Sequence, residues 1–267
     1  RGYDAVVRTG GPNAGHTMTL RDMVKFKMRQ VPCAWNLDTS LYIGPGGLIN
    51  VEVLSGEVEQ IRQYLNGNPM AHKLVIDAAA TIITPAHAER ESGIKLWDST
   101  GSTLEGVGAA RAEKAVRLVD IAHTWIIKHP LDAVMNKYVA VTKTVPVSEL
   151  LLSHRNVLVE STQGFGLSLN YSGYYPQVTS GDLTPAQILN DAGLGGCRNY
   201  RVVGVMRTYP IRVAGNSGPL FGETTWEKLE QDSNGYIKQE HTTVTNRVRR
   251  VGTWDSYLAR RFGTICR

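Results

Sequence analysis

The sequence has 267 residues, of which 42% are hydrophobic and 20% are charged, a balance typical of a globular protein with a substantial core. No segment approaches the ~18 consecutive apolar residues of a membrane span, so we expect a soluble, cytoplasmic protein. The three cysteines (Cys33, Cys197 and Cys266) are too few and too far apart for a disulfide framework or a CxxC metal pair. The net charge of +5 favours an anionic partner, although a diffuse excess of this size more often only keeps a protein soluble.

Short apolar runs and helical spacings alternate along the chain. We expect strands at 3–8, 41–43, 73–77, 156–160 and 200–208. Helices are expected at 52–65, at 109–128, and from Pro185 to just before Gly193. Strands that alternate with helices predict an α/β fold with a mainly parallel central sheet flanked by helices.

Segments rich in glycine or hydroxyl side chains directly follow several of these strands, at 9–17, 44–47, 161–169 and 213–218. In open α/β sheets, ligands bind beyond the carboxyl ends of the strands, so the segments together predict one large polar pocket. None of them reads GxxxxGK[ST] or GxGxxG, which leaves a standard P-loop or Rossmann site unsupported.

The first of these segments reads GGPNAGHT over residues 10–17. Its glycines let backbone amides approach a ligand closely, and the amide of Asn13 can donate and accept at once. His16 can transfer a proton near neutral pH. The alternative interpretation is a glycine-rich turn with an incidental histidine. The segment resembles the GGxNAGHT signature of adenylosuccinate synthetases.

The second segment reads DSTGSTLEGVG over residues 98–108 and precedes an expected helix. The free N–H groups of a helix start favour an anion, although serine and threonine also precede helices as caps. The segment resembles the family's GTTGxGxGP sequence, which binds the phosphate of the acceptor nucleotide. Thr100 and Gly101 match it, whereas Asp98 and Ser99 depart from it.

The third segment reads VLVESTQGFGL over 157–167 and is followed by YYPQVTS over 174–180. It resembles the family's EGxQGxxL and YPYVTS sequences. The resemblance implies that Gln163 binds the purine edge and takes part in catalysis, and that Leu167 and Thr179 contact the nucleotide. A glutamine at a strand end is often only structural.

The fourth segment reads TTVTNRVRRVG over 242–252 and resembles the family's aspartate loop, TTxxRxRRxG. The resemblance implies that Thr243, Thr245 and Arg249 bind aspartate, and that Arg247 contacts both aspartate and the ribose. Arginine binds carboxylates bidentately, which suits this role. The alternative interpretation is a solvated basic face or a nucleic-acid patch.

Two further positions carry family roles by resemblance. Val213, in the PIRVAGNSG segment, would lie against the ribose. Arg117 stands where the family has an arginine that reaches the neighbouring subunit's nucleotide, which implies a homodimer.

The resemblance implies a P-loop-NTPase-like adenylosuccinate synthetase fold and a ligase reaction. A nucleoside triphosphate phosphorylates the purine's 6-oxo group, L-aspartate displaces the phosphate, His16 acts as the acid, and Mg²⁺ binds the Gly15 carbonyl. We expect residues 1–267 to form a single domain that lacks the family's N-terminal phosphate loop, which should precede Arg1. The segment that selects the donor base should likewise follow Arg267.

The acceptor nucleotide depends on the branch of the family. The PIRVAGNSG, GETTWEKL and TTVTNRVRR sequences look more like the short phage or archaeal-like branch. We therefore expect dGMP as acceptor and ATP or dATP as donor. The product would be N6-succino-2-amino-2'-deoxyadenylate, on the route to 2-aminoadenine DNA. IMP with GTP is the alternative.

Two alternatives outside catalysis also stay open, a nucleic-acid-binding protein and a non-catalytic nucleotide sensor. Aromatic residues do not interleave the basic runs, so we expect no nucleic acid as partner. We expect no membrane as partner either.

Overall fold

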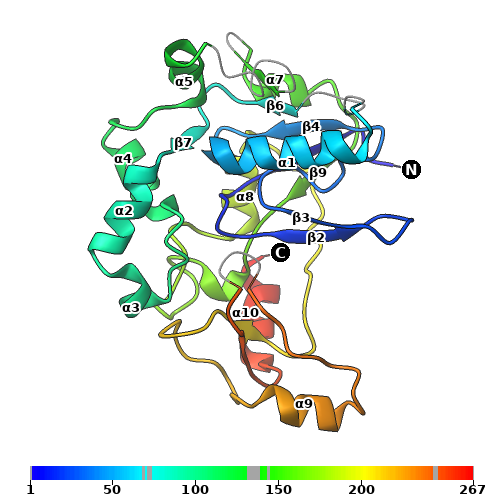
Figure 1. The fold of residues 1–267 in the computed structure, drawn as a ribbon, viewed down its shortest axis with the longest axis vertical. Helices are drawn as coiled ribbons and strands as arrows, with labels where there is room; N and C mark the ends of the chain where they lie inside the picture. The colour runs from blue at the N-terminus through cyan, green and yellow to red at the C-terminus, as the bar shows by residue number, and fades with distance from the viewer. Residues whose placement is uncertain are drawn as a thin grey trace. The chain divides into compact units, whose positions relative to one another are not determined.

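The computed structural model describes residues 2–67, 70, 74–130, 139–142, 145–242 and 246–266. The chain forms two compact units (Figure 1). Unit 1 comprises residues 1–90, 105–162 and 186–197, and unit 2 comprises 91–104, 163–185 and 198–267. None of the helices in the described part combines the length and the apolar character that crossing a bilayer requires.

Unit 1 contains the larger share of the regular secondary structure, and its helices α2 and α8 extend slightly across its boundaries. Its elements are β1 (Ala5–Arg8), β2 (His16–Thr19), β3 (Lys25–Met28), β4 (Ser40–Ile43), β5 (Leu48–Asn50), α1 (Val51–Tyr64), β6 (Leu74–Ile76), β7 (Thr81–Ile83), α2 (Pro85–Gly93), α4 (Val107–Ala115), α5 (Ala122–Lys128), β8 (Val139–Val141), α7 (Val147–Leu151), β9 (Val157–Glu160) and α8 (Pro185–Asp191).

A five-stranded sheet lies at the centre of unit 1, with the strand order β8-β6-β4-β1-β9 and every neighbouring pair parallel. Side chains of β1 enter two cores because successive residues of a strand face opposite sides. Val6 packs in the core that includes Leu54 of α1. Ala5 and Val7 pack in the core that includes Leu151 of α7. Helices therefore cover both faces, and the predicted α/β fold with a mainly parallel sheet is confirmed.

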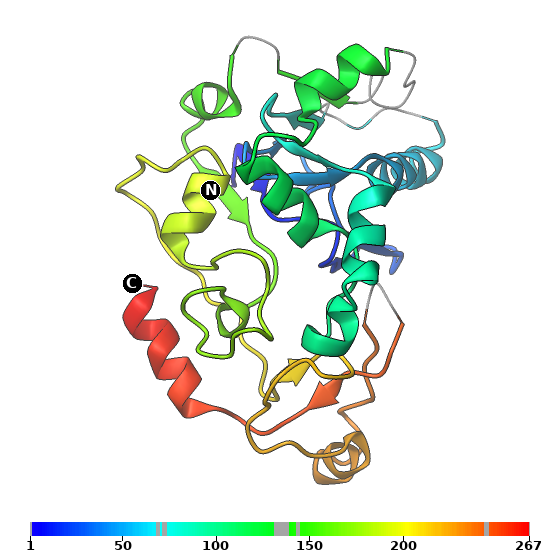
Figure 2. The same ribbon diagram turned by 90° about the vertical axis from the view of Figure 1, so that its left-hand side faces the viewer.

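Unit 2 consists mainly of loops braced by short elements. These are α3 (Leu96–Thr100), the 3₁₀ turn η1 (Phe165–Leu167), β10 (Ile211–Arg212), α9 (Trp226–Asp232), β11 (Arg250–Val251) and α10 (Ser256–Ile265). Figure 2 shows β10 and β11 as a short antiparallel pair, in yellow and orange. The side chains of Thr225 and Asp255 accept hydrogen bonds from the first turns of α9 and α10, which starts both helices where the sequence offers a cap.

The predictions of two secondary-structure elements are wrong. The helix expected at 109–128 is two helices, because Arg117 adopts a left-handed backbone conformation (φ 65°) between α4 and α5. The strand expected at 200–208 has no regular secondary structure, and the Val205 side chain is 94% exposed. Strand propensity depends on packing against a neighbour, and an apolar sequence alone does not supply one. In addition, residues 98–100 of the second segment are helical, at the end of α3.

Candidate functional site

The carboxyl ends of three adjacent strands lie at the same level in unit 1. Arg8, the last residue of β1, pairs in register with Ile43 of β4 on one side and with Glu160 of β9 on the other. The glycine-rich loop 9–17, the loop 44–47 and the start of the 161–169 segment therefore leave the sheet side by side. This is the edge at which open α/β sheets bind ligands.

The glycine-rich loop turns back sharply against β9. Gly10 has φ +90°, a conformation that favours glycine, and a Cβ atom there would collide with the Thr162 hydroxyl. The chain then returns as β2, which begins at His16 and pairs with Met28 of β3. The loop's geometry thus fixes His16 close to the ends of β1 and β9.

His16, Arg8 and Glu160 form one hydrogen-bonded cluster. Oε1 of Glu160 lies 2.6 Å from His16 Nδ1 and also accepts from the Arg8 guanidinium, whose Nη1 lies 3.3 Å from the same ring nitrogen. The second carboxylate oxygen accepts from the Cys33 backbone N–H at 2.9 Å. The side chain of Arg8 is only 3% exposed and that of Glu160 14%, whereas that of His16 is 37% exposed. Glu160 thus fixes the imidazole of His16 through its Nδ1 atom.

Neighbouring charges set the protonation states of this cluster. Burial raises the pKa of Glu160, but the hydrogen bond with His16 and the charge of Arg8 outweigh burial and hold that pKa below its usual value. Burial, followed by the negative charge of Glu160, raises the pKa of the Cys33 thiol to about 12. At neutral pH the cluster therefore contains an ionised carboxylate beside a protonated thiol.

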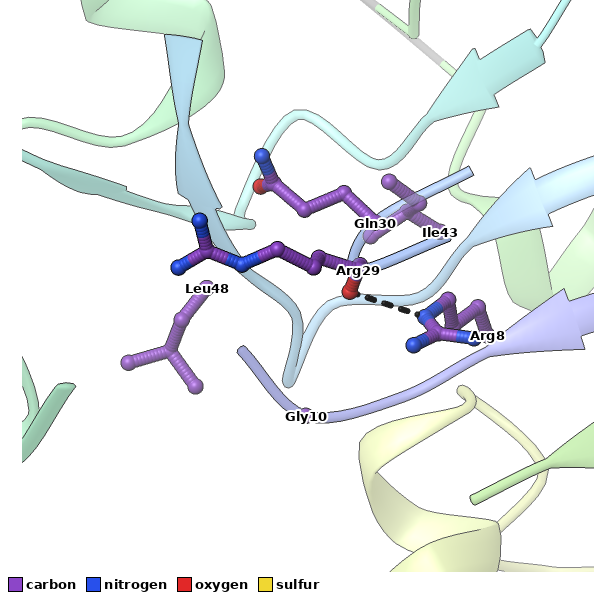
Figure 3. A pocket seen from close by; sticks show the side chains of 6 residues that line it. All are labelled: Arg8, Gly10, Arg29, Gln30, Ile43 and Leu48. Atoms are coloured by element: carbon purple, nitrogen blue, oxygen red, sulfur yellow. Dashed lines mark hydrogen bonds between the residues drawn. The ribbon is translucent and has the colours of Figure 1, made fainter. Parts of the chain in front are cut away.

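Two arginines border a small pocket next to this cluster. Figure 3 shows its lining, with the side chain of Arg8 donating from Nε to the Arg29 carbonyl at 3.1 Å. Arg29 in turn donates from Nε to the Pro12 carbonyl at 2.5 Å and forms an ion pair with Glu105. The pocket is lined by Arg8, Gly10, Arg29, Gln30, Ile43 and Leu48. Both arginines thus brace the glycine-rich loop by binding main-chain carbonyls.

The described residues of unit 1 offer two candidate metal environments. His16, Cys33 and Glu160 bring possible ligand atoms within 4.8 Å of one another. Their thiol and imidazole are soft donors and Arg8 already occupies the carboxylate, so this cluster does not fit Mg²⁺. Gly15 is half-buried, and its backbone carbonyl is a hard oxygen ligand, which fits a Mg²⁺ ion that takes its other ligands from phosphate and water.

Asn13 has an unusual environment. Its Oδ1 atom is buried and has no hydrogen-bond partner among the residues that the structure describes. A buried acceptor without a partner costs free energy, so this atom is suited to a ligand that brings a donor.

In unit 2, the second and third segments and the PIRVAGNSG loop meet. Ser99 accepts through its carbonyl from Gln177 Nε2 at 3.3 Å and from Asn216 Nδ2 at 3.4 Å. The Thr100 hydroxyl donates to the Leu96 carbonyl at 2.8 Å, within its own helix. Gly101 follows with φ +68°, and a Cβ there would lie 2.8 Å from that of Ser217. In this arrangement the backbone of the 98–101 segment is tightly packed.

The other nucleotide-binding candidates lie in the same unit. Leu167 and Thr179 are joined by a backbone hydrogen bond of 2.8 Å, so two residues predicted to contact the nucleotide lie side by side. Gln163 is exposed and has φ +61°, a conformation that is strained for a side chain of this type. The Val213 carbonyl accepts from the Ser217 hydroxyl at 2.5 Å.

The arginines of the fourth segment differ in their partners. Arg250 binds Glu223 bidentately, with both distances 2.6 Å. Arg249 donates to the His241 carbonyl at 3.3 Å and lies 3.8 Å from Glu240. Arg247 is exposed, and its guanidinium lies 3.9 Å from the centre of the Trp97 ring. Thr243 and Thr245 lie outside the described residues.

Comparison with known proteins shows the family. The family model described as adenylosuccinate synthetase matches residues 1–150 and 129–266. The adenylosuccinate synthetase of Methanococcus maripaludis (strain C5) is 37% identical over 260 residues, which cover 96% of this chain and 70% of that protein. The one of Archaeoglobus fulgidus is 35% identical over 252 residues, which cover 94% and 68%. The chain belongs to the adenylosuccinate synthetase family.

Solved structures agree with this assignment. The succinoaminodeoxyadenylate synthetase (PurZ) of cyanophage S-2L, solved with dGMP and with dATP as an energy donor, matches with a TM-score of 0.83 at 29% identity. That match covers 98% of this chain and 74% of the phage protein. The adenylosuccinate synthetase of Plasmodium falciparum shares the fold, with a TM-score of 0.73 at 24% identity over 95% of this chain and 66% of that one. The chain is therefore an enzyme of adenylosuccinate synthetase type, a ligase that joins aspartate to a purine nucleotide.

Sequence reasoning missed Arg8 and Glu160 as members of the His16 cluster. Both were assigned only to strands, because an apolar run with one charged end residue is a common strand pattern. The position of each charge at the carboxyl end of a predicted parallel strand was the available signal.

We expect the Arg8–Glu160 pair to make stability depend on pH. The pKa of Glu160 is lowered in the folded protein, so its stabilising contribution is fully present above the ordinary value of 4.5 and is lost as the pH falls from 4.5 through the lower pKa of the folded state. Glu160→Gln should lower the melting temperature at pH 7, and the difference from wild type should shrink as the pH falls below 4.5. Thermal unfolding across this range checks the prediction, and a difference that stays constant would contradict it.

Proposed function

We propose that the chain is the dGMP-accepting form of the family, which makes N6-succino-2-amino-2'-deoxyadenylate from dGMP, L-aspartate and ATP or dATP. The observation that carries this proposal is the likeness to the cyanophage S-2L enzyme, whose structure contains dGMP and dATP and which matches nearly the whole chain. The branch-like sequences PIRVAGNSG and TTVTNRVRR support the same choice.

The geometry around His16 supports the first chemical step. A 6-oxo group is a poor leaving group, so O6 must be phosphorylated before an amine can replace it. Because Glu160 holds Nδ1 of His16, the Nε2 atom on the opposite side of the ring is available to donate a proton to the phosphate oxygens as the nucleoside diphosphate leaves. In the same step O6 attacks the γ-phosphorus, and the purine gives up its N1–H proton to a general base. The adjacent carboxylate orients the ring for this role, as the carboxylate does in a Ser-His-Asp triad.

Asn13 supports the assignment of a 6-oxopurine. Both dGMP and IMP carry an N1–H donor beside O6, and the buried Oδ1 atom of Asn13 has no partner among the described residues. We propose that this atom accepts from N1–H. Gln163, Leu167, Thr179, Val213, Thr100 and Gly101 are proposed nucleotide contacts.

In the second step the aspartate amine attacks C6 and inorganic phosphate leaves with the former O6. Aspartate carries two carboxylates, and we propose that Arg247, Arg249, Thr243 and Thr245 bind it. Among the three described arginines of the segment, Arg250 is already neutralised by Glu223, whereas Arg247 retains its donors for a ligand.

Mg²⁺ is the proposed cofactor. Bound through the Gly15 carbonyl, phosphate oxygens and water, it would offset the charge of the transferring phosphoryl group. Gly15 lies directly before His16, so the same short loop holds the metal ligand and the acid.

We also propose a homodimer in which Arg117 reaches the neighbouring subunit's nucleotide. Its exposed position and its left-handed conformation, at the break between α4 and α5, support this role. An exposed arginine between two helices is accessible to another subunit's phosphate.

An ordinary adenylosuccinate synthetase that uses IMP and GTP is the second candidate. The archaeal adenylosuccinate synthetases favour it, because their identity of 35–37% exceeds the 29% of the phage enzyme.

A crossed assay distinguishes the two. The full-length protein is mixed with aspartate and Mg²⁺, dGMP or IMP is combined with ATP, dATP or GTP, and phosphate release is measured with and without aspartate. We expect aspartate-dependent release with dGMP and an adenine nucleotide, at a kcat/KM at least roughly tenfold above that with IMP. A preference for IMP would assign the ordinary enzyme, and release that is independent of aspartate would contradict both.

A further inference from the structure

The Arg247 guanidinium is held by an aromatic ring in place of a carboxylate. Its distance of 3.9 Å from the Trp97 ring centre is well within the ~6 Å range of cation–π contacts. No ion pair of Arg247 is found in the described part of the chain, although Arg249 and Arg250 of the same segment both lie near glutamates. Within the described residues, the side-chain donors of Arg247 are therefore not taken up by a carboxylate.

The Trp97 ring is itself fixed by its surroundings in unit 2. The backbone carbonyl of Trp97 accepts from the Gly101 N–H at 2.9 Å, at the end of helix α3. Gly215 packs against the ring so closely that a Cβ there would lie 3.0 Å from Trp97 Cζ2. Asn216 donates to the Asp98 carbonyl at 3.1 Å, which joins the next residue of the helix to the same loop. The indole is thus packed against the Gly215 loop, and Arg247 lies over its ring.

A carboxylate partner would fix an arginine equally well, but it would neutralise the charge and occupy donors that a ligand needs. An indole fixes the guanidinium through its face and leaves the in-plane N–H groups free. An arginine held in this way is prepared to bind a carboxylate bidentately, with less conformational freedom to lose on binding.

We propose that Trp97 is a positioning residue that holds Arg247 ready for a carboxylate of the amino-acid substrate. This inference rests on the proposed role of Arg247 in binding aspartate. It assigns no direct contact between the indole and the substrate.

The kinetic test compares Trp97→Leu, which removes the aromatic face, with Trp97→Phe, which keeps a weaker one. With whichever nucleotide pair the wild-type enzyme accepts, Trp97→Leu should raise KM for aspartate about 3- to 30-fold, the range expected for a lost cation–π contact. Trp97→Phe should give a smaller rise, and the nucleotide KM should change less than twofold for both. Trp254→Leu, at a half-exposed tryptophan of the same unit, is the matched control and should leave the aspartate KM unchanged. A uniform loss of kcat with an unchanged aspartate KM would overturn the proposal.

Two further measurements separate this inference from the proposed function. In the double variant, Trp97→Leu should add no more than a small further effect to Arg247→Lys, because both act through the same guanidinium. Fully additive effects would overturn the proposal. If the enzyme turned over neither nucleotide pair, the proposed function would fail, and NMR of the ligand-free protein would still test the stacking. Side-chain protons of Arg247 should be shifted upfield in wild type and lose that shift in Trp97→Leu, and an unshifted Arg247 in wild type would overturn the stacking itself.

Discussion

Replacing His16 with alanine should lower kcat by about 10²- to 10⁴-fold, the contribution typical of a positioned general acid. In the proposed mechanism a proton donor assists departure of the nucleoside diphosphate when the phosphoryl group transfers to O6, and departure of phosphate from C6 in the second step. The imidazole of His16 is the most exposed side chain of the Arg8–His16–Glu160 cluster. Without it, water would have to donate the proton.

The same substitution should change the melting temperature by only a few degrees. After His16 is removed, Glu160 still accepts from Arg8 and from the Cys33 N–H, so no buried charge is left without a partner. His129→Ala, at an exposed histidine at the end of α5, is the control and should leave kcat unchanged. Steady-state kinetics and thermal unfolding of both variants check the prediction. Turnover of the His16 variant within a few-fold of wild type would remove His16 from the reaction.

Replacing Arg8 with methionine should destabilise the protein by roughly 3–5 kcal/mol, the usual cost of breaking a buried ion pair by removing one partner. Arg8 is nearly inaccessible and also donates to the carbonyls of Ala14, Met28 and Arg29. Its loss would leave the Glu160 carboxylate buried with less compensation and would free the glycine-rich loop. For a chain of this size, the melting temperature should fall by about 6–20 °C.

Arg90→Met is the matched control for Arg8→Met. The Arg90 side chain is 57% exposed and pairs with Glu113 at 3.3 Å, so its loss should cost about 1 kcal/mol or less. Thermal or denaturant unfolding of both variants measures the difference. An equal, small effect of the two substitutions would show that the Arg8–Glu160 pair does not stabilise the fold.

The sheet of unit 1 could be predicted because its strands carry local signals. The apolar runs that become β1, β4, β6 and β9 are short and bounded by turn residues, and they are buried in β1, β4 and β6 and partly buried in β9. Parallel pairing brings their carboxyl ends to one edge, so the loop that carries His16 was placed correctly at a strand end from sequence order alone.

The pairing of His16 with Glu160 could not be predicted in this way. The two residues are separated by 144 positions, and neither propensity nor periodicity indicates which charged side chains meet across a sheet. The break between α4 and α5 was missed for a related reason. The apolar spacing continues through Val116 and Val119, but Arg117 adopts a left-handed conformation that only the tertiary context imposes.

The stacking of Arg247 on Trp97 was equally invisible in the sequence. Arg247 belongs to the fourth segment of the sequence analysis, whereas Trp97 belongs to none. Trp97 lies just before the DSTGSTLEGVG sequence and carried no predicted role, and the arginine run was compatible with a solvated basic face. The 215–218 loop packs on α3, and Arg247 lies over the Trp97 ring, both through contacts between residues that are distant in the chain.

The most direct test of the proposed reaction follows the oxygen at C6 of the purine. The enzyme is supplied with aspartate, Mg²⁺, adenine nucleotide and dGMP that carries ¹⁸O at position 6, and the released phosphate is analysed by mass. A 6-phosphoryl intermediate predicts that one labelled oxygen enters each phosphate formed with the succinylated product. Unlabelled phosphate, with product formed at the same rate, would contradict phosphorylation of O6.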